Sequence, residues 1–358
     1  MKWLITGGAG FIGCNAACRL LAEGHRVVIL DNLARRGSAL NLDWLRQQGD
    51  FDLVQGDVRR ADTLKRTFER HPDIGIALHL AAQVAVTTSV ASPREDFDIN
   101  ALGTFNVLEA VRQCQPGAIV LNASTNKVFG QLGGAKLRQK GTRYEAANLP
   151  KGVSEDFPLD FHSPYGCSKG AADQYVRDYA RIYGLRTVNF RQSCIYGPRQ
   201  FGVEDQGWVA WFAICAVLGR PICLYGDGRQ VRDVLFVDDL VDCYLEAVTR
   251  IEATRGQHYN IGGGPANTLS LLELIRLLEQ RLGRKVAHQF ADLRPGDQKV
   301  YVSDIRKAQR DFGWRPRTRV AQGLAALLEW VSDNQDDLRR MEAAVLPAEM
   351  AVSGRDGY

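Results

Sequence analysis

The stretch from Trp3 to Gly13 decides the fold and reads Trp3-Leu4-Ile5-Thr6-Gly7-Gly8-Ala9-Gly10-Phe11-Ile12-Gly13. Four residues typical of a buried strand lead directly into a glycine-rich turn, and a helical pattern follows. In such a unit, Gly7 permits the tight turn, Gly10 lets the backbone approach a pyrophosphate, and Gly13 allows close packing of helix against strand. The amides at the start of the helix favour a bound phosphate. The stretch therefore predicts a dinucleotide site.

The first two thirds of the chain repeat this alternation of short apolar runs with segments of helical period. This pattern predicts an α/β fold with a doubly wound parallel sheet of the Rossmann type, covered by helices on both faces. The predicted strands are Trp3–Thr6, Arg26–Leu30, Phe51–Val54, Ile76–Leu80, Ala118–Ala123 and Arg186–Phe190.

From about Cys194 onward the pattern changes. Short strands at Pro221–Tyr225 and His258–Ile261 are mixed with amphipathic helices at Leu269–Leu282 and Ala321–Asn334. We therefore expect three parts: a cofactor-binding domain over residues 1–193, a smaller α/β substrate-binding domain over 194–346, and a flexible tail over 347–358. Residues 234–244 are expected to return to the first domain.

Composition excludes several classes of protein. The chain has 358 residues, 45% of them hydrophobic, which is enough to bury a substantial core. Its net charge of +4 is spread along the sequence and gives no support for a nucleic-acid partner. The eight cysteines form no CxxC pair, so we expect reduced thiols and no metal site. The amino terminus lacks the layout of a signal peptide, and the longest apolar run, Trp208–Leu218, is too short to span a bilayer. These features predict a cytoplasmic protein with no membrane partner.

The cofactor is predicted to be NAD. Asp31 ends the second predicted strand, where a carboxylate accepts hydrogen bonds from ribose hydroxyls and repels the extra phosphate of NADP. Asp57 is expected beside the adenine, although a turn residue is an alternative for it. Small residues after the fourth strand would let the backbone lie close to the cofactor. Outside the catalytic pair described next, the predicted contacts are Gly7, Gly10, Phe11, Ile12, Asp31, Asn32, Asp57, Val58, Leu80, Ala81, Ala82 and Asn100.

The catalytic residues are predicted in the run Tyr165-Gly166-Cys167-Ser168-Lys169, which places tyrosine and lysine one helical turn apart on one face. A tyrosine has a pKa of about 10, and lowering it by roughly three units takes about 4 kcal/mol. The ammonium of Lys169 and a positive nicotinamide ring supply such a field, and both residues would also contact the cofactor. Thr125, at the end of the fifth strand, is expected to donate to the substrate oxygen. A core tyrosine with a solvated lysine is the alternative, which the upstream glycine motif disfavours.

These motifs resemble those of extended short-chain dehydrogenases/reductases, and within them nucleotide-sugar epimerases and dehydratases, over nearly the whole chain. The resemblance implies NAD, a nucleotide-diphosphate sugar as substrate, and a homodimer or homotetramer formed through the helix that carries Tyr165. The matching pieces are Gly7–Gly13, Asp31, Asp57, His79–Ala82, Thr125 with Val128–Gly130, Tyr165–Lys169, Arg232–Val234 and Arg294–Asp297.

The reaction is predicted from the two residues after Thr125. Dehydratases of this family carry an Asp-Glu pair there, whereas this chain has Asn126 and Lys127, so an epimerase is favoured. The stretches Ser124–Gly130, Phe161–Tyr175, Tyr196–Phe201 and Asp205–Trp208 resemble epimerases that invert carbon 2 of a CDP-linked hexose. Inversion of carbon 4 of a UDP-linked hexose or uronic acid is the alternative. A non-catalytic NAD-binding scaffold or sensor is the alternative from another class.

The substrate contacts are predicted mainly among the basic residues. The resemblance puts Arg232 and Arg294 at the diphosphate, since guanidinium makes bidentate contacts with phosphate oxygens. A surface or interface ion pair is the alternative for each. The complete set of predicted substrate contacts is Asn126, Lys127, Arg199, Gln200, Gln206, Arg232 and Arg294.

Overall fold

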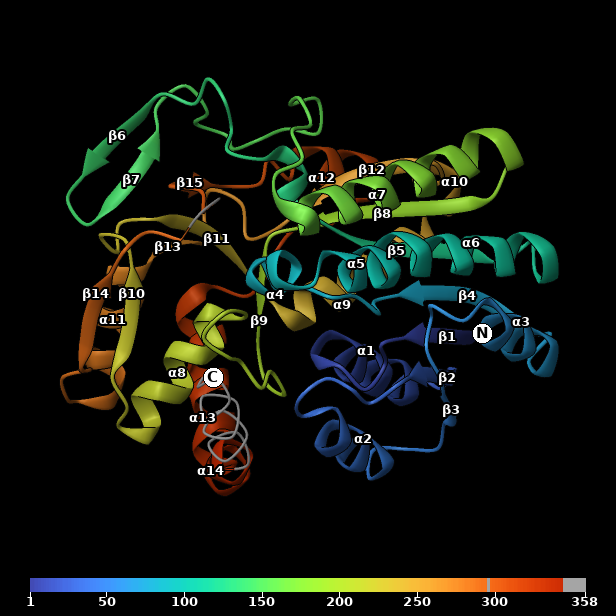
Figure 1. Cartoon of the computed structure of the whole chain (residues 1–358), viewed down its shortest axis with the longest axis horizontal. Helices are drawn as coiled ribbons and strands as arrows, with labels where there is room; N and C mark the ends of the chain where they lie inside the picture. The colour runs from blue at the N-terminus through green and yellow to red at the C-terminus, as the bar shows by residue number, and fades with distance from the viewer. Residues whose placement is uncertain (295–296, 344–358) are drawn as a thin grey trace, which may run out of the picture.

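The computed structural model describes residues 1–294 and 297–343. Its centre is a sheet of seven parallel strands in the order β12-β8-β5-β4-β1-β2-β3, with β1 and β4 side by side in the middle (Figure 1). The fold class predicted from the sequence is confirmed. The strands of this sheet are β1 (Lys2–Thr6), β2 (Arg26–Asp31), β3 (Asp52–Gln55), β4 (Ile74–His79), β5 (Ile119–Thr125), β8 (Arg186–Gln192) and β12 (Gln257–Ile261).

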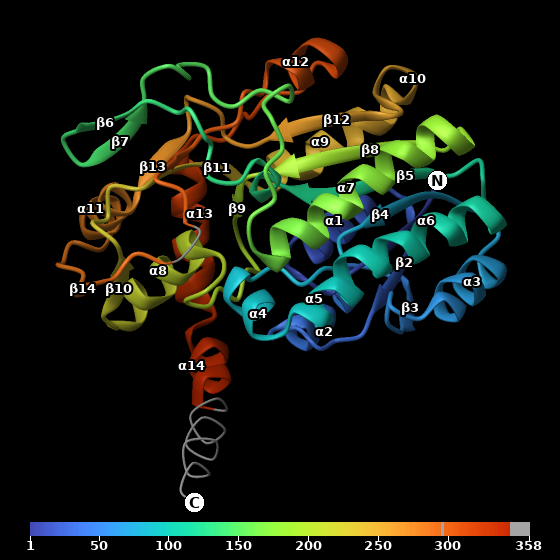
Figure 2. The same ribbon diagram turned by 45° about the horizontal axis from the view of Figure 1, so that its top comes forward.

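Helices cover both faces of the sheet because alternate strand residues point to opposite sides. Trp3 and Ile5 pack in one apolar cluster, whereas Leu4 packs in the other. On the first face lie α1 (Phe11–Ala22), α2 (Ser38–Arg46), α9 (Val237–Thr249), α10 (Ile251–Thr254) and α12 (Arg306–Phe312). On the second face lie α3 (Ala61–Arg70), α6 (Gly103–Cys114) and α7 (Ser163–Tyr183), with α6 and α7 side by side in Figure 2. The short segments α4 (Val86–Ala91), α5 (Pro93–Phe97) and the π-helical turn η1 (Asp98–Leu102) lead into α6.

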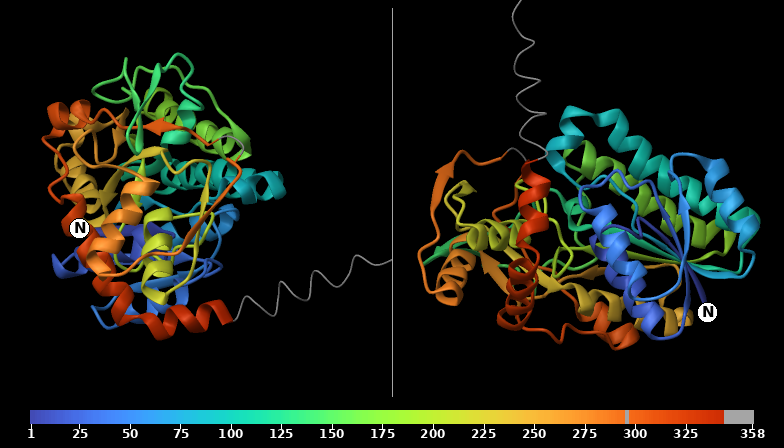
Figure 3. Two further views of the ribbon diagram at one scale, coloured as in Figure 1. Left: turned by 90° about the vertical axis from the view of Figure 1, so that its left-hand side faces the viewer. Right: turned by 90° about the horizontal axis from the view of Figure 1, so that it is seen from below.

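The smaller part of the molecule lies beside the carboxyl ends of the strands and has its own apolar core (Figure 3). Its strands are β9 (Cys194–Tyr196), β11 (Val231–Phe236), β13 (Thr268–Ser270) and β15 (Val300–Tyr301), with a separate parallel pair, β10 (Ile222–Tyr225) and β14 (His288–Ala291). Its helices are α8 (Trp208–Leu218), α11 (Leu271–Leu282), α13 (Val320–Asp333) and α14 (Gln335–Ala343). Ser270 caps α11 in a reciprocal bond with Glu273, so this helix begins two residues after its predicted start.

The structure revises the predicted domain boundary. Strand His258–Ile261, expected in the second domain, is part of β12 and pairs with β8 at the edge of the main sheet. Residues 234–244 were predicted to return to the first domain, and this holds for helix α9, whose residues Leu240 and Tyr244 pack in the core under the main sheet. It does not hold for Val234–Phe236, which belong to β11 of the smaller part. The chain therefore crosses between the two parts several times. The predicted tail 347–358 lies outside the described residues.

The long segment between Gly130 and Tyr165 contains a hairpin of β6 (Leu137–Lys140) and β7 (Arg143–Ala146). It follows the short 3₁₀ turn η2 (Asn126–Phe129) and extends over the smaller part (Figures 1 and 2). None of the described helices is both long and apolar enough to cross a membrane.

Candidate active site

The glycine-rich turn after β1 forms the predicted cofactor cradle. Gly7 has a φ of 71°, and an added Cβ there would lie 2.7 Å from the backbone nitrogen of Ala81. At Gly13 an added Cβ would overlap the carbonyl of Gly7. Both positions therefore require glycine, which fits a backbone built to lie against a pyrophosphate.

Asp31 lies at the carboxyl end of β2 and holds this turn in place. One carboxylate oxygen accepts from the Ala9 amide at 3.0 Å, and the other accepts from the Leu33 amide at 2.8 Å. Burial raises the pKa of Asp31. Each oxygen keeps acceptor capacity beyond these bonds, so the position suits the ribose hydroxyls predicted for it.

Asn32 and Asp57 come together at the ends of β2 and β3. The Asn32 amide donates to Asp57 Oδ2 at 3.0 Å, and the Arg59 guanidinium donates to both Asp57 oxygens. Burial opposes ionisation of Asp57, but the bonds from Arg59 and Asn32 hold its pKa at about 2. Asp57 is thus an ionised group bound by protein donors, and its predicted contact with adenine stays a prediction. Val58 beside it is buried against the side of Gly103.

The segment after β4 closes the cradle on the other side of β1. The Ala81 amide donates to Thr6 Oγ1 at 3.3 Å, so the chain at Leu80, Ala81 and Ala82 lies directly over Gly7. Asn100, in the π-helical turn η1, accepts from the Gln83 amide at 3.0 Å. Insertions of this π-helical kind occur often at functional sites.

The three predicted catalytic residues lie at the carboxyl end of β5 and on α7. Thr125 ends β5, and Tyr165 lies in the first turn of α7, where the Thr125 hydroxyl is close enough to act on its pKa. Lys169, one turn further along, donates to the carbonyl of Ala123 at 2.6 Å. All three side chains are buried. The structure therefore brings together the trio that the sequence predicted.

Burial shifts the pKa values of Tyr165 and Lys169. It raises the pKa of Tyr165 to about 12, although the nearby Thr125 hydroxyl acts in the opposite direction. It lowers the pKa of Lys169 to about 8, against the attraction of Asp173 and Asp96. Tyr165 is a neutral phenol under these conditions, so it needs additional positive charge nearby to become a base at pH 7.

Sequence reasoning missed two carboxylates beneath the trio. Asp96 is buried and accepts from Ser168 at 2.5 Å and from Asn100 at 3.1 Å, so it ties η1 to α7 next to Lys169. Asp173 is fully buried and forms a bidentate pair with Arg191 at 2.9 and 3.0 Å, while also accepting from Ser124. Their spacing in the sequence could have indicated them. Asp96 lies four residues before Asn100, and Asp173 lies four residues after Lys169, so each carboxylate shares a helical face with a predicted site residue.

On the substrate side, Asn126, Lys127 and Arg232 lie near Thr125. Asn126 is buried, and its side-chain oxygen lies 3.4 Å from the Thr125 hydroxyl. The Lys127 ammonium and the Arg232 guanidinium share Asp297, at 3.8 and 2.6 Å. Burial and the charge of Arg232 lower the pKa of Lys127 to about 8. Two cations thus converge on one carboxylate, and their predicted contact with the diphosphate stays a prediction.

The remaining predicted substrate residues are dispersed. Arg294 stacks on Tyr225 at 3.8 Å and pairs with Asp205 at 2.7 Å. Gln206 forms a turn with Val203 through backbone bonds. Gln200 is buried and donates to the carbonyl of Ile195. The middle of the Arg294–Asp297 motif, residues 295–296, lies outside the described residues.

Arg199 contacts the cofactor-binding part of the chain. Its guanidinium covers the Trp44 ring of α2 at 4.4 Å, and its backbone adopts a φ of 69°. The side chain therefore contacts α2, and its predicted contact with the substrate stays a prediction.

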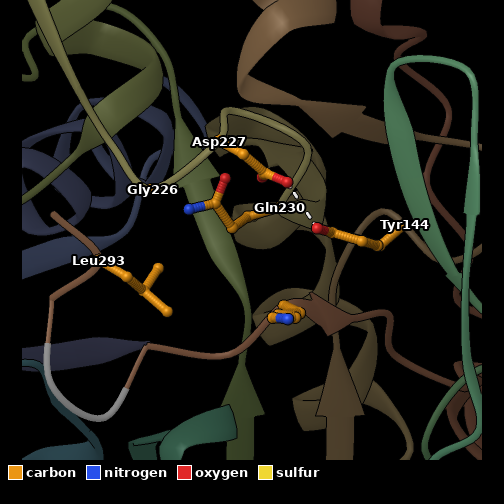
Figure 4. Close-up of a pocket in the computed structure, with 6 residues that line it drawn as sticks. Tyr144, Gly226, Asp227, Gln230 and Leu293 are labelled. Carbon is orange, nitrogen blue, oxygen red and sulfur yellow. Dashed lines mark hydrogen bonds between the residues drawn. The ribbon is translucent and has the colours of Figure 1, made fainter. Parts of the chain in front are cut away.

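The β6–β7 hairpin docks on the turn between β10 and β11 and helps enclose a cavity of about 200 Å³ (Figure 4). Tyr144 donates to Asp227 at 2.5 Å, and the Tyr144 amide donates to the carbonyl of Arg229 at 3.0 Å. Gln230, buried in the wall of the cavity, has a side-chain oxygen without a hydrogen-bond partner in the described part of the chain. The hairpin therefore shapes the far end of the substrate half.

A Rossmann-type sheet with a Thr, Tyr and Lys trio at the carboxyl end of its central strands defines an extended short-chain dehydrogenase/reductase. The family described as GDP-mannose 4,6 dehydratase matches residues 4–327. The chain belongs to this family.

Relatives in the family include epimerases. CDP-paratose 2-epimerase of Salmonella typhi is 45% identical over 338 residues, which cover 93% of this chain and 99% of that protein. UDP-glucose 4-epimerase of Thermotoga maritima, solved with UDP-glucose, has a TM-score of 0.81 at 29% identity and covers 94% of this chain and 100% of its own. The Thermus thermophilus UDP-glucose 4-epimerase complex with NAD has a TM-score of 0.76 at 31% identity, over 92% of this chain and 99% of its own. The predicted enzyme class, a carbohydrate epimerase, and the predicted cofactor, NAD, are confirmed by these relatives.

Proposed function

We propose that this protein inverts carbon 2 of a CDP-linked deoxyhexose in an NAD-dependent reaction, in the manner of CDP-paratose 2-epimerase. The observation that carries the proposal is the 45% identity to that enzyme over 93% of the chain. Asn126 and Lys127 support it, because they occupy the positions where dehydratases of the family carry an acid pair.

The chemistry that we propose needs one proton shuttle. Tyr165 removes the proton of the sugar hydroxyl while Thr125 donates a hydrogen bond to the same oxygen, so the carbon becomes a ketone. Bound NAD would accept the hydride of that carbon and return it, and its positive ring would help to lower the pKa of Tyr165. The ketone then presents its opposite face, and Tyr165 gives its proton back as the hydroxyl forms again.

Other residues of the site position the substrate and exclude water. Arg232 and Lys127 would bind the diphosphate in exchange for their present partner Asp297. Gly7, Gly13 and Asp31 fit the pyrophosphate and ribose of NAD. Lys169, fixed on the carbonyl of Ala123, would hold its charge beside Tyr165.

Proton NMR in deuterated water tests the reaction. The purified protein with bound NAD is incubated with CDP-paratose, and in parallel with CDP-, UDP- and GDP-linked glucose, while configuration at carbons 2 and 4 is followed. We expect inversion at carbon 2 of the CDP-linked deoxyhexose without deuterium uptake, because the hydride returns to the carbon it left. A Tyr165→Phe sample controls for contaminating enzymes.

Each other result contradicts part of the proposal. Inversion confined to carbon 4 would keep the mechanism and assign a 4-epimerase, the activity named for the Thermotoga maritima structure. Deuterium at the inverted carbon would replace hydride return with proton exchange. No conversion of any donor, with reduced cofactor bound, would indicate an NAD-binding scaffold.

We further propose that the chain acts in the cytoplasm as a homo-oligomer. The outer face of α7 exposes Tyr175 and Ile182, with 46% and 67% of their surface accessible. An exposed apolar face of this kind is typical of a subunit contact. Light scattering is expected to give a multiple of 39.7 kDa, and Ile182→Asp to reduce it; a 39.7 kDa particle for the wild type would reject the oligomer.

A further inference from the structure

A second cavity opens at the amino-terminal edge of the main sheet. We call it the α7–β12 cavity. Its volume is about 420 Å³, and its walls are the end of α7, the segment before β8 and the loop before β12. Strand β8 runs from Arg186 near this edge to Gln192, which pairs with Thr125. Seven residues span roughly 20 Å. The α7–β12 cavity is therefore separate from the active site.

Three arginines line the α7–β12 cavity: Arg177, Arg181 and Arg255. Neither Arg177 nor Arg181 has a hydrogen bond or ion-pair partner among residues 1–294 and 297–343. Arg255 pairs with the exposed Glu252 at 3.4 Å. Burial, together with repulsion from Arg181, lowers the pKa of Arg177. Arg177 is half-buried, whereas Arg181 and Arg255 are exposed, so the positive charge of the cavity lies mainly at its rim.

The nearest buried carboxylate does not neutralise these arginines. Asp173 acts on Arg177, but both of its oxygens are bound by Arg191, which lies deeper in the molecule. Lys307 beneath the cavity donates to the carbonyl of His258 and to Gln257. Asp173 and Lys307 are therefore engaged with other described residues, which leaves the exposed carboxylates Glu252 and Asp178 as the acids beside these arginines.

His258 is a further polar residue in the wall of this cavity. It lines the α7–β12 cavity, and its Nδ1 atom is buried without a hydrogen-bond partner in the described part of the chain. Burial and the charges of Arg191 and Lys307 lower its pKa to about 4, so the ring is neutral at pH 7. Buried polar atoms are normally paired, so this atom calls for an explanation, of which an ordered water or ion is one.

Helix termini explain only part of this arrangement. Arg181 lies in the last turn of α7, where a cation complements the negative end of the helix. Arg177 lies one turn earlier, and Arg255 comes from another element. We propose that the α7–β12 cavity binds a phosphorylated small molecule, whose phosphate groups are held by Arg177, Arg181 and Arg255.

The ligand chemistry follows from the side chains. Guanidinium groups bind phosphate oxygens through paired N–H donors, and three of them around one hollow match a group with several negative charges. The volume lies within the range of small-molecule sites, about 300–1,000 Å³. Tyr175 and Ile182 lie on the opposite side of α7 by helical spacing, so an oligomer formed there leaves the cavity open.

Calorimetry on the full chain with NAD tests this site. CDP is kept in excess to occupy the substrate site, inorganic pyrophosphate is the probe, and the salt is about 0.15 M to screen diffuse charge. We expect one saturable pyrophosphate site per chain. Arg177→Ala with Arg181→Ala is expected to weaken its affinity at least tenfold without loss of epimerase activity.

The matched control is Arg66→Ala with Arg70→Ala on α3, which removes the same charge at the same spacing from another surface. This control is expected to change pyrophosphate affinity less than twofold. Equal weakening by both pairs, or no saturable binding, would leave an adventitious ion only and overturn the site.

ATP as a second probe distinguishes the sources: affinity equal to that of pyrophosphate assigns recognition to the phosphates, and tighter binding adds a nucleoside contact at Ala180 and Leu185. Because the measurement is a binding constant compared between variants, its outcome does not depend on which carbon the enzyme inverts.

Discussion

Two regions of this molecule hold their charged groups in different ways. The catalytic edge consists of the carboxyl ends of the central strands with α7, and the substrate half is the smaller part of the molecule. Lys169 and Asp173 are buried, and each is fixed by neighbours from the main sheet. Arg294 and Arg232 instead pair with Asp205 and Asp297, whose side chains are 43% and 31% exposed. The difference indicates a rigid catalytic framework facing a set of exchangeable ion pairs. Changes at the first should abolish function or folding, whereas changes at the second should tune binding.

Tyr165→Phe is expected to have the largest effect. The change removes the hydroxyl that exchanges a proton with the substrate and leaves the buried ring, so kcat should fall by about 10³-fold or more while NAD stays bound. The rate of epimerisation is measured by NMR, and the amount of bound NAD is measured by absorbance after denaturation. A rate within tenfold of wild type would remove Tyr165 from the mechanism.

Asp173→Asn should be the most damaging change to stability. It leaves Arg191, with 1% of its side chain exposed, without its counter-ion in the core. Breaking one half of a buried pair typically costs about 3–5 kcal/mol. Urea unfolding at pH 7 measures the loss. Asp178→Asn, on the exposed side of the same helix, is the control and should stay within about 0.5 kcal/mol. Similar values for the two variants would show that the Asp173 pair is not a framework element.

Acid should weaken the rigid edge through His79. This buried ring bonds with Thr6 at 2.7 Å and Thr104 at 3.0 Å, and burial lowers its pKa to about 3. The unfolded chain, with a pKa of about 6.5, then binds more protons between pH 6.5 and 3, so the free energy of unfolding falls as the pH falls. From pH 7.5 to 5, His79 should contribute a loss of about 2 kcal/mol.

His79→Asn tests that contribution. The variant should be less stable at neutral pH, because it cannot keep both bonds, but its free energy of unfolding should decline less steeply with acid than that of the wild type. Denaturant titrations at pH 7.5, 6 and 5 give the two slopes. Parallel slopes would place the acid sensitivity at another group.

The sequence predicted the catalytic edge well because its information is local. A strand running into Gly7–Gly13 and a Tyr–Lys spacing of one helical turn each determine a geometry within a few residues. Strand β12 was assigned to the wrong part, since a short apolar run does not indicate which sheet it joins. Asp96 and Asp173 resemble solvated helix positions until packing buries them. The orientation of Arg199 depends on Trp44, which is distant in the sequence, so no motif could supply it.

The smallest effect is expected at the β6–β7 hairpin, where the substrate half meets solvent. Tyr144→Phe removes the bond to Asp227 but keeps the ring, the Lys299 contact at 5.3 Å and the backbone bond to Arg229. A bond at a partly exposed position contributes about 1 kcal/mol or less, so stability should hardly change. If the hairpin shapes the nucleotide end of the site, KM for the nucleotide sugar should rise a few-fold at constant kcat.

Tyr183→Phe on the exposed end of α7 makes the same chemical change far from this cavity and should leave both constants unaltered. A fall in kcat for Tyr144→Phe would instead connect the hairpin to the catalytic edge, and the distinction between a rigid framework and a tunable substrate half would fail at this point.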